Sequence, residues 1–361
     1  DVAELHLHGG RAVVAGVLAA LAARPGLRLA EPGEFTRRAF DNGRLDLTEV
    51  EGLADLIAAE TEAQRRQALR QMRGALGALC EGWRGRLVHA LAYLEATIDF
   101  SDEDITVDLD GQVRPVLADL RTAISAHLDD GHRGERLRDG VRIAIVGPPN
   151  AGKSSLLNAL ARRDVAIVSE TAGTTRDVIE VHLDLGGAPV IVADTAGLRD
   201  TVDAVEAEGV RRARARAAEA DLRLLVLDAT GPLDVSLDPG EGETLVLVNK
   251  VDLAPPGWAP PAGALALSVK TGAGLDHLLT ALAERVGGAA DAGAAALITR
   301  ARHREALTET LAALDRCDGD GDPELLAEDL RLAARALGRI AGRVDVEDLL
   351  DVIFRDFCIG K

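Results

Sequence analysis

The sequence predicts a multidomain protein in which an α/β domain with a doubly wound sheet interrupts a discontinuous helical domain. The first observation is apolar residues at helical spacing in two early stretches, 69–98 and 113–128. The second is the return of this spacing near the end of the chain, at 298–316, 323–340 and 346–357. The third is a series of short β-rich runs between them, at 141–146, 178–185, 190–193, 222–227, 245–248 and 265–267. Runs of this kind, separated by loops and helical segments, indicate a sheet layered with helices.

The first 60 residues predict smaller elements. Residues 1–8 alternate apolar and polar, which favours a strand, and residues 11–23 are typical of a short helix. We interpret residues 32–47, "PGEFTRRAFDNGRLDL", as a polar connection. The spacing of a capping box occurs at two places, Thr48 with Glu51 and Thr61 with Gln64.

Two segments mark the borders of the β-rich region. Residues 129–140, "DDGHRGERLRDG", interrupt the helical pattern as a linker does. Residues 287–296, "GGAADAGAAA", stand where the chain leaves the β-rich region. We therefore expect the helical stretches on either side to pack together as one domain.

Composition limits the class of protein and its partners. Hydrophobic residues make up 47% and aromatic residues only 2%, so we expect a core of Leu, Val, Ala and Ile. A formal net charge of −18 argues against a surface that is basic all over, so nucleic acid would have to meet a local patch or a second protein. The longest apolar run, 12–23, is shorter than the roughly 20 residues of a membrane-spanning helix, so we expect no membrane span.

Cysteine usage and the first residues bear on compartment and completeness. Three cysteines, Cys80, Cys317 and Cys358, lie far apart and give no disulfide framework, which favours a reducing cytoplasm. The acidic, alternating start is unlike a signal peptide. It also lacks Met and opens inside the predicted strand, so we expect the natural beginning to lie upstream.

A phosphate-binding loop follows the first β-rich run of the central region. The run "VRIAIV" leads into "GPPNAGKSS", residues 147–155, and then into the helical "LLNAL". This is G-x-x-x-x-G-K-S between a strand and a helix, where backbone N–H groups and the helix N-terminus attract phosphate oxygens. Lys153 supplies a positive charge to the β- and γ-phosphates, and the Ser154 hydroxyl is a ligand for Mg²⁺.

Further short motifs select guanine and place the γ-phosphate. In "LVLVNKVD" a carboxylate at Asp252 accepts from the N1–H and N2–H of guanine, and Asn249 meets the other edge of the base. The Lys250 stem lies along the ring, and "SVK", residues 268–270, closes over it. "DTAG", residues 194–197, suits a Mg²⁺-linked aspartate and a γ-phosphate-sensing glycine, and Thr175 of "AGTTRD" offers a second metal-ordering hydroxyl. The order of these motifs predicts GTP binding.

The predicted GTP contacts and metal ligands are drawn from these motifs and from the segment before Thr175. They are Asn150, Ala151, Gly152, Lys153, Ser154, Ser155, Ser169, Thr171, Thr174, Thr175, Asp194, Thr195, Ala196, Gly197, Asn249, Lys250, Asp252, Ser268, Val269 and Lys270.

Two features of the hydrolytic machinery are unusual. Leu198 follows "DTAG", where many GTPases have a glutamine that orients the attacking water. The candidates for that role are the acidic residues of the next loop, Asp200, Asp203, Glu206 and Glu208. No arginine finger is assigned. On chemical grounds the amide oxygen of Asn150, with loop carbonyls at Ser169 and Thr171 and with Thr174, is a candidate cage for a monovalent cation in its place.

Four stretches together carry a resemblance to a known family. They are "PGEFTRRAFDNGRLDL", "GPPNAGKSSLLNAL", the interrupted "SETAGTTRD…DTAGLRD…VEAEG" and the terminal "CIGK". On these the chain resembles, from end to end, the MnmE (TrmE) family of tRNA modification GTPases, which is grouped with the TrmE-Era-EngA-like GTPases. The resemblance implies a P-loop GTPase domain inserted in the discontinuous helical domain.

The resemblance also implies roles for residues and a set of partners. It implies K⁺ ligands at Asn150, Ser169, Thr171 and Thr174, and Mg²⁺ ligands at Ser154 and Thr175. It selects Glu206 as the residue that orients water, with Lys153 and Asn150 as catalytic partners. The implied activity is K⁺-dependent GTP hydrolysis by a homodimer whose G domains pair on GTP and K⁺. A heterotetramer with MnmG, which uses FAD and NADH, then forms 5-aminomethyl- or 5-carboxymethylaminomethyluridine at the tRNA wobble position.

A folate donor and the domain borders are likewise implied by the resemblance. The donor is 5-formyl- or 5,10-methylene-tetrahydrofolate, with contacts at Glu4, Arg44 and Lys361. Residues 1–43 correspond to the end of an N-terminal folate-binding and dimerisation domain. The helical domain consists of a first segment at 44–139 and a second segment at 289–361, with the G domain at 140–288 between them. Because most of the first domain lies upstream of Asp1, we expect weak dimerisation and weak folate binding by this chain alone.

Several alternatives stay open from the sequence. Cys358 lacks the neighbours of a prenylation site, and it is interpreted either as a buried thiol or as a catalytic candidate near the folate. Glu4, His6 and His8 share one face of the predicted strand and form a candidate metal triad.

Two other function classes compete with tRNA modification. One is a switch in ribosome assembly, and the other is a nucleotide-gated scaffold that binds proteins. The "CIGK" tail and the "FTRRAF" stretch argue against both.

Overall fold

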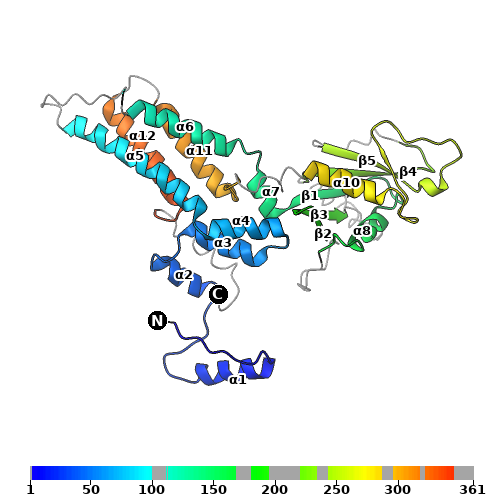
Figure 1. Cartoon of the computed structure of the whole chain (residues 1–361), viewed down its shortest axis with the longest axis horizontal. Coiled ribbons are helices and arrows are strands. Elements are labelled where there is room, and N and C mark those ends of the chain that lie inside the picture. Colours follow the sequence, from blue (N-terminus) through cyan, green and yellow to red (C-terminus); the bar gives the residue numbers. More distant parts are fainter. Residues whose placement is uncertain are drawn as a thin grey trace, which may run out of the picture.

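The computed structural model describes residues 2–99, 111, 113–167, 180–194, 220–233, 243–286, 296–317 and 322–344. These residues form a body of long helices and a sheet domain, joined through the short helix α7 (Arg133–Asp139), as Figure 1 shows. No helix within these ranges is both long and apolar enough to cross a membrane.

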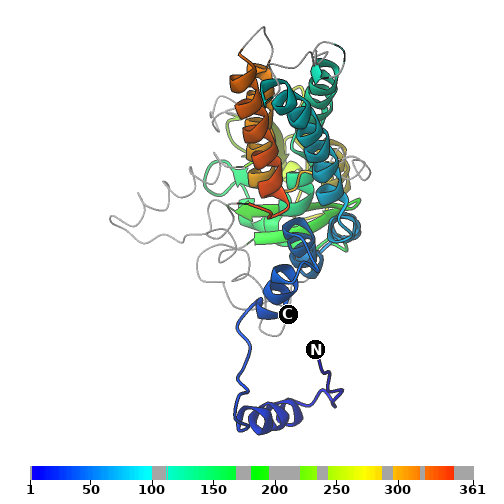
Figure 2. The same cartoon turned by 90° about the vertical axis from the view of Figure 1, so that its left-hand side faces the viewer.

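The long helices come from both sides of the sheet domain in the sequence. They are α5 (Ala75–Asp99), α6 (Arg114–Leu128), α11 (Ala301–Arg316) and α12 (Pro323–Ile340). Helix α12 packs against α5 and α11, and α11 packs against α6 (Figure 2). Their shared core contains Leu87 and Leu120 from the early segment and Leu307 and Leu337 from the late segment, all buried. The expectation of one discontinuous helical domain is confirmed.

The sheet has six strands in the order β2-β3-β1-β4-β5-β6. They are β1 (Val141–Val146), β2 (Glu180–Leu185), β3 (Ala188–Asp194), β4 (Leu222–Asp228), β5 (Glu243–Asn249) and β6 (Leu265–Ala266). All neighbouring pairs are parallel except β2 with β3. Parallel strands need crossover connections, which place helices on the sheet faces. Within the described residues, each β-rich run predicted from the sequence therefore corresponds to a strand of one α/β sheet.

Strands β1 and β4 lie at the centre of the sheet and contribute much of its core. Ile143 of β1 pairs with Val192 of β3 on one side and with Leu222 of β4 on the other. Six of the seven residues of β4 are buried, as in a strand covered on both faces. Helices α8 (Lys153–Ala161) and α10 (Leu275–Val286) contribute buried leucines to this core. The carboxyl ends of these strands are thereby held at one edge.

Two helices appear where we interpreted connections. Helix α2 (Glu34–Asp41) lies inside the segment 32–47, because Gly33 at its start adopts φ 69° and Phe40 packs on a small core of Leu47 and Val50. Helix α7 lies inside the linker 129–140, with Leu137 2% exposed. Both interpretations were wrong, because packing of Phe40 on Leu47 and Val50 stabilises α2 and burial of Leu137 stabilises α7.

The N-terminal prediction is only partly correct. Residues 2–8 form no strand and are exposed, because no neighbouring strand satisfies their backbone. Helix α1 (Arg11–Ala22) is present as predicted, but none of its residues is buried. It lies apart from the long helices in both views (Figures 1 and 2).

One of the two predicted capping boxes is displaced. At α3 (Leu47–Ala58) the box is formed by Asp46 and Glu49, whose side chains accept from each other's backbone N–H at 2.9 and 2.7 Å. Thr48 is fully buried, and its hydroxyl donates to Asp46. The Thr61–Gln64 box at α4 (Glu62–Met72) is confirmed. The predicted helical stretch 69–98 is divided after α4, where Gly74 adopts φ 81°.

Glu51, the second residue of the predicted Thr48–Glu51 box, belongs instead to a buried network of charges. Glu51 is 1% exposed and binds Arg302 through two hydrogen bonds of 2.6 Å. His303 is fully buried, and its Nε2 lies 2.9 Å from Glu51. Burial lowers the pKa of His303, and the neighbouring Glu51 carboxylate opposes that shift. Burial alone would raise the pKa of Glu51, but His303 and Arg302 hold it well below its usual range.

The network continues to the helix that leads into the sheet domain. Asp55 of α3 accepts from Arg300 at 2.8 Å and from Arg138 of α7 at 3.0 Å. Burial raises the pKa of Asp55, while Arg300 and Arg138 oppose that shift. A chain of ion pairs thus ties α11, α3 and α7 into one support.

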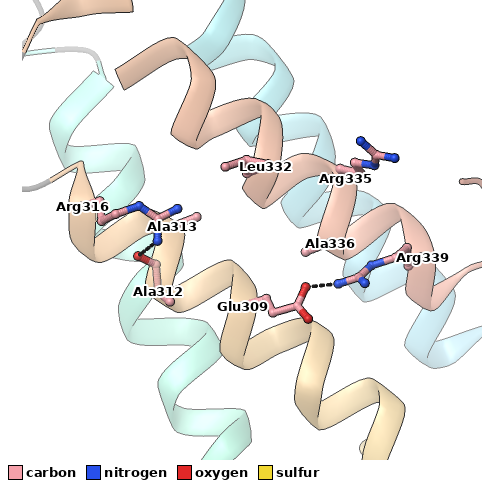
Figure 3. A pocket seen from close by; sticks show the side chains of 8 residues that line it. All are labelled: Glu309, Ala312, Ala313, Arg316, Leu332, Arg335, Ala336 and Arg339. Atoms are coloured by element: carbon pink, nitrogen blue, oxygen red, sulfur yellow. Dashed lines mark hydrogen bonds and ion pairs between the residues drawn. The ribbon is translucent and has the colours of Figure 1, made fainter. Parts of the chain in front are cut away.

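A groove of about 480 Å³ lies between α11 and α12 (Figure 3). Its residues are Glu309, Ala312, Ala313, Arg316, Leu332, Arg335, Ala336 and Arg339. Arg339 bonds Glu309 across the groove, and Arg316 donates to the carbonyl of Ala312 at 3.1 Å (Figure 3) and to Asp329 at 2.7 Å. These arginine contacts remain within α11 and α12, so they stabilise the packing of the helix pair.

Candidate nucleotide site

The phosphate loop lies between β1 and α8 and depends on its glycines. Gly147 adopts φ 138°, and a Cβ there would lie 2.2 Å from the carbonyl oxygen of Val226. Gly152 adopts φ 97°, and a Cβ there would lie 2.3 Å from Nδ2 of Asn249. Both positions combine a left-handed backbone with a close approach that only glycine permits. The motif therefore has the local structure that its spacing predicts.

Lys153 begins α8 and lies over the loop. Its side chain is buried, and Nζ donates to the carbonyls of Gly147 and Pro148 at 2.9 and 2.8 Å. Burial lowers the pKa of Lys153, and the nearby Asp194 opposes that shift. The positive charge thus stands at the centre of the loop, where phosphate oxygens are expected.

Ser154 and Asp194 meet beside the loop. The Ser154 hydroxyl donates to Oδ2 of Asp194 at 2.5 Å, and Asp194 ends β3 with 4% exposure. The parallel pairing of β1 with β3 explains the meeting, because it brings their carboxyl ends together. Two hard oxygen donors side by side are a suitable set for Mg²⁺.

Asn249 braces the loops around the predicted base site. It ends β5 and is 3% exposed. Its Nδ2 donates to the carbonyl of Ala151 at 2.9 Å, and its Oδ1 accepts from the backbone N–H of Val269 at 3.1 Å. One buried amide therefore connects the phosphate loop with the "SVK" loop.

Lys250 and Asp252 extend this arrangement. Lys250 adopts φ 63°, and its Nζ donates to the Asn150 carbonyl at 2.8 Å and to Asp228 at 2.6 Å. Ser268 is buried and donates to Oδ1 of Asp252 at 2.6 Å. The structure thus brings together the predicted base-recognition residues at the ends of β5 and β6.

Asp228 is a site residue that was not predicted from the sequence. It ends β4, and burial would raise its pKa, but hydrogen bonds from Lys250 and Thr230 hold the pKa below its usual range. An acidic residue at the carboxyl end of a mostly apolar strand was the available signal, since such positions line the ligand edge of parallel sheets.

Other predicted residues lie outside the described ranges or apart from this site. Ser169, Thr171, Thr174, Thr175, Thr195, Ala196, Gly197, Glu206, Cys358 and Lys361 are outside the described residues. The Asn150 side chain is exposed at the loop. Glu4 and Arg44 are exposed, and the described ranges of the chain do not assemble them into a folate pocket.

Neither the candidate metal triad nor the described cysteines form a reactive site. Glu4 lies 3.8 Å from His6, and no group of three metal-ligating side chains exists among the residues described above. Cys80 and Cys317 are buried, and burial raises the pKa of their thiols to about 12 and about 11. These two thiols are therefore poor nucleophiles.

Comparisons with known proteins cover the whole chain. The model described as the MnmE helical domain matches residues 47–358, and the model described as the GTP-binding protein TrmE N-terminus matches residues 1–44. The tRNA modification GTPase MnmE of Parvibaculum lavamentivorans is 63% identical over all of this chain and 83% of its own length. Those of Rhodospirillum rubrum and Paramagnetospirillum magneticum are 59% and 60% identical over all of this chain, and 81% and 83% of their own lengths. With its phosphate loop, its base-recognition loops and these matches, the chain belongs to the MnmE family of tRNA modification GTPases.

Proposed function

We propose that this chain is a K⁺-dependent GTP hydrolase that acts in the modification of tRNA wobble uridines. The observation that supports the nucleotide half of the proposal is the convergence of Lys153, Ser154 and Asp194 on one loop. Asn249 and Asp252 stand at the carboxyl end of β5 and are held there by hydrogen bonds. The tRNA half rests on membership of a family whose relatives are named tRNA modification GTPases.

Different groups of the phosphate loop bind the phosphates and the metal ion. Backbone N–H groups of the loop and the N-terminus of α8 hold phosphate oxygens, and Lys153 moves from its carbonyl contacts to the β- and γ-phosphates. Ser154 with Thr175 would hold Mg²⁺, and Asp194 would orient that site through Ser154. When bound, Mg²⁺ offsets the negative charge that develops on the phosphates.

Guanine recognition follows from the second group of residues. Asp252 accepts from the N1–H and N2–H of the base, while Ser268 fixes the carboxylate. Asn249 holds the phosphate loop and the loop containing Val269 at a constant separation. The Lys250 stem lies beside the ring, and Asp228 holds its ammonium group.

Hydrolysis needs a water to be oriented and charge to be stabilised at the γ-phosphate. Leu198 has no hydrogen-bonding group for a water, so we assign that role to Glu206. Asn150, Ser169, Thr171 and Thr174 would hold K⁺ in the place that an arginine finger occupies in other GTPases. The cation would supply positive charge near the bond that breaks.

The proposed reaction also needs partners. We propose that G domains of two chains pair on GTP and K⁺, and that a heterotetramer with the FAD-dependent MnmG acts on the tRNA in the cytoplasm. The one-carbon unit would come from 5-formyl- or 5,10-methylene-tetrahydrofolate held by Glu4, Arg44 and Lys361. Cys358 is proposed to stand near that donor, either as a buried thiol or as a participant in the chemistry.

Reconstitution tests this proposal directly. The chain, extended upstream to the length of its relatives, is incubated with MnmG, FAD, NADH, tetrahydrofolate donor, GTP, K⁺ and unmodified tRNA, and nucleosides are analysed by mass spectrometry. We expect 5-aminomethyl- or 5-carboxymethylaminomethyluridine only when GTP and the folate are both present. Formation of neither nucleoside, although GTP is hydrolysed, would reject the tRNA half of the proposal.

A further inference from the structure

The side chain of His182 on β2 contacts the helical body. Its Nδ1 lies 2.7 Å from Oε2 of Glu60, in the connection between α3 and α4. Both side chains are about one-third exposed, at 31% and 30%. The contact therefore joins the edge strand of the sheet to the connection between α3 and α4, which precedes it by 122 residues.

Glu60 is held in place by the capping box of α4. The backbone N–H groups of Glu60 and Thr61 donate to Oε1 of Gln64 at 2.9 and 3.0 Å. The other end of the same amide, Nε2 of Gln64, donates to the carbonyl of Arg138 at 3.0 Å, near the end of α7. Gln64 thus fixes both Glu60 and the helix from which the chain enters β1.

The backbone of His182 pairs with the residue that directly precedes the segment 168–179. Its carbonyl accepts from the N–H of Ile167 at 2.8 Å, and Ile167 directly precedes that segment. Glu180, which directly follows it, is the first residue of β2. A second hydrogen bond, from the N–H of Asp184 to the carbonyl of Val165 at 2.8 Å, extends this pairing. Ile167, which flanks the segment on one side, is therefore bonded to His182 itself, and Glu180, which flanks it on the other side, lies two residues from His182 on β2.

The sequence of that segment contains the predicted cation ligands Ser169, Thr171, Thr174 and Thr175. From this arrangement we propose that the His182–Glu60 contact couples the nucleotide state of the G domain to its orientation on the helical body. The inference rests on the proposed GTP hydrolysis, and His182 and Glu60 act as positioning residues. A partly exposed pair contributes little to stability, so it can break and form again within each cycle.

Distance measurements between the helical body and the sheet domain test the coupling. Spin labels are placed at Val88→Cys on α5 and Glu284→Cys on α10, both exposed, in a chain with Cys358→Ser. Cys80 and Cys317 are buried and react poorly. Distance distributions are recorded without nucleotide, with GDP and with a non-hydrolysable GTP analogue.

We expect Glu60→Ala and His182→Ala to broaden the nucleotide-free distribution and to reduce its shift on addition of the GTP analogue. The double variant should be no broader than either single variant, because the two residues make one contact. His182→Asn keeps an N–H donor near the position of Nδ1 and should restore the wild-type distribution. Asp276→Ala is the matched control, since it removes an exposed ion pair with Arg163 inside the sheet domain.

A second readout separates this inference from the proposed function. Modified uridines formed per GTP hydrolysed should fall about fivefold in Glu60→Ala and His182→Ala. GTP hydrolysis by the chain itself should stay unchanged. Distance distributions that match the wild type in both variants overturn the inference, whatever the reconstitution gives. Absence of K⁺-dependent hydrolysis in the wild type would instead overturn the proposed function.

Discussion

The hydroxyl of Ser154 lies 2.5 Å from Oδ2 of Asp194, which joins the first turn of α8 to the end of β3. This contact places a serine and an aspartate from motifs 40 residues apart at the loop where phosphates are expected. It links the phosphate loop to the segment after β3, in which the γ-phosphate-sensing glycine is predicted. Ser154 and Asp194 are therefore the natural first targets for mutation.

Ser154→Ala removes a predicted Mg²⁺ ligand, and Asp194→Asn removes the charge that orients it. Outer-shell partners of metal ligands typically contribute 10- to 100-fold to metal affinity, so we expect Asp194→Asn to weaken Mg²⁺-dependent GTP binding by about that factor. The affinity is measured by titration with a fluorescent GTP analogue, in Mg²⁺ and, as the control without metal, in EDTA. Equal losses with and without Mg²⁺ would show that the pair supports the loop and not the metal.

Asn249→Ala leaves a buried carbonyl at Ala151 and a backbone N–H at Val269 without their partner. Unsatisfied buried groups cost about 1–3 kcal/mol, so we expect a loss of that size in the free energy of unfolding. Denaturant titration measures it. Asn249→Asp is the informative comparison, because it keeps the acceptor for Val269 but faces the Ala151 carbonyl with a negative oxygen. A variant Asn249→Ala as stable as the wild type would contradict the bracing role.

Asp252→Asn tests base recognition. The carboxylate accepts from two guanine donors, whereas an amide presents one donor and one acceptor, which suits xanthine with its C2 carbonyl. We expect GTP affinity to fall about 10- to 100-fold and xanthosine triphosphate affinity to rise. Competition binding with both nucleotides measures this change in base preference. Equal weakening of both would indicate that Asp252 serves the loop through Ser268 alone.

Glu51→Gln tests the buried charge network. The change leaves Arg302 without its carboxylate, and breaking one partner of a buried pair costs about 3–5 kcal/mol. Because the folded pKa of Glu51 lies below its usual 4.5, its stabilisation is present above that pH and is lost as pH falls. The free energy of unfolding of the variant should therefore change less than that of the wild type between about pH 5 and about pH 3. Parallel pH profiles would contradict this account.

The nucleotide site was largely predictable because its motifs are local. The phosphate loop needs glycine at 147 and 152 for steric reasons that any sequence of this pattern shares, and the structure confirms the strand and helix around it. Asn249 and Asp252 were found because they form one short motif, "NKVD", at the end of an apolar strand. Asp228 was missed because one acid after a strand forms no motif, and its role appears only when Lys250 reaches it from the neighbouring strand.

The supporting elements were less predictable because their partners are remote. Helix α7 is stabilised by Gln64, Gln67 and Asp55, which bind its backbone or side chains from α3 and α4. Thr48 fits the capping pattern in the sequence as well as Asp46 does. In the structure Thr48 is fully buried inside the first turn of α3, and Asp46 is the N-cap. Residues 1–8 alternate as a strand does, yet alternation cannot supply the partner strand that pairing needs.

The most direct measurement of the central claim is the GTP turnover rate in K⁺ and in Na⁺ at equal ionic strength, for the wild type and for Glu206→Gln. We predict turnover that is fast in K⁺ and slow in Na⁺, and loss of turnover in the variant with GTP affinity retained. Equal rates in the two salts, together with undiminished turnover by Glu206→Gln, would contradict it.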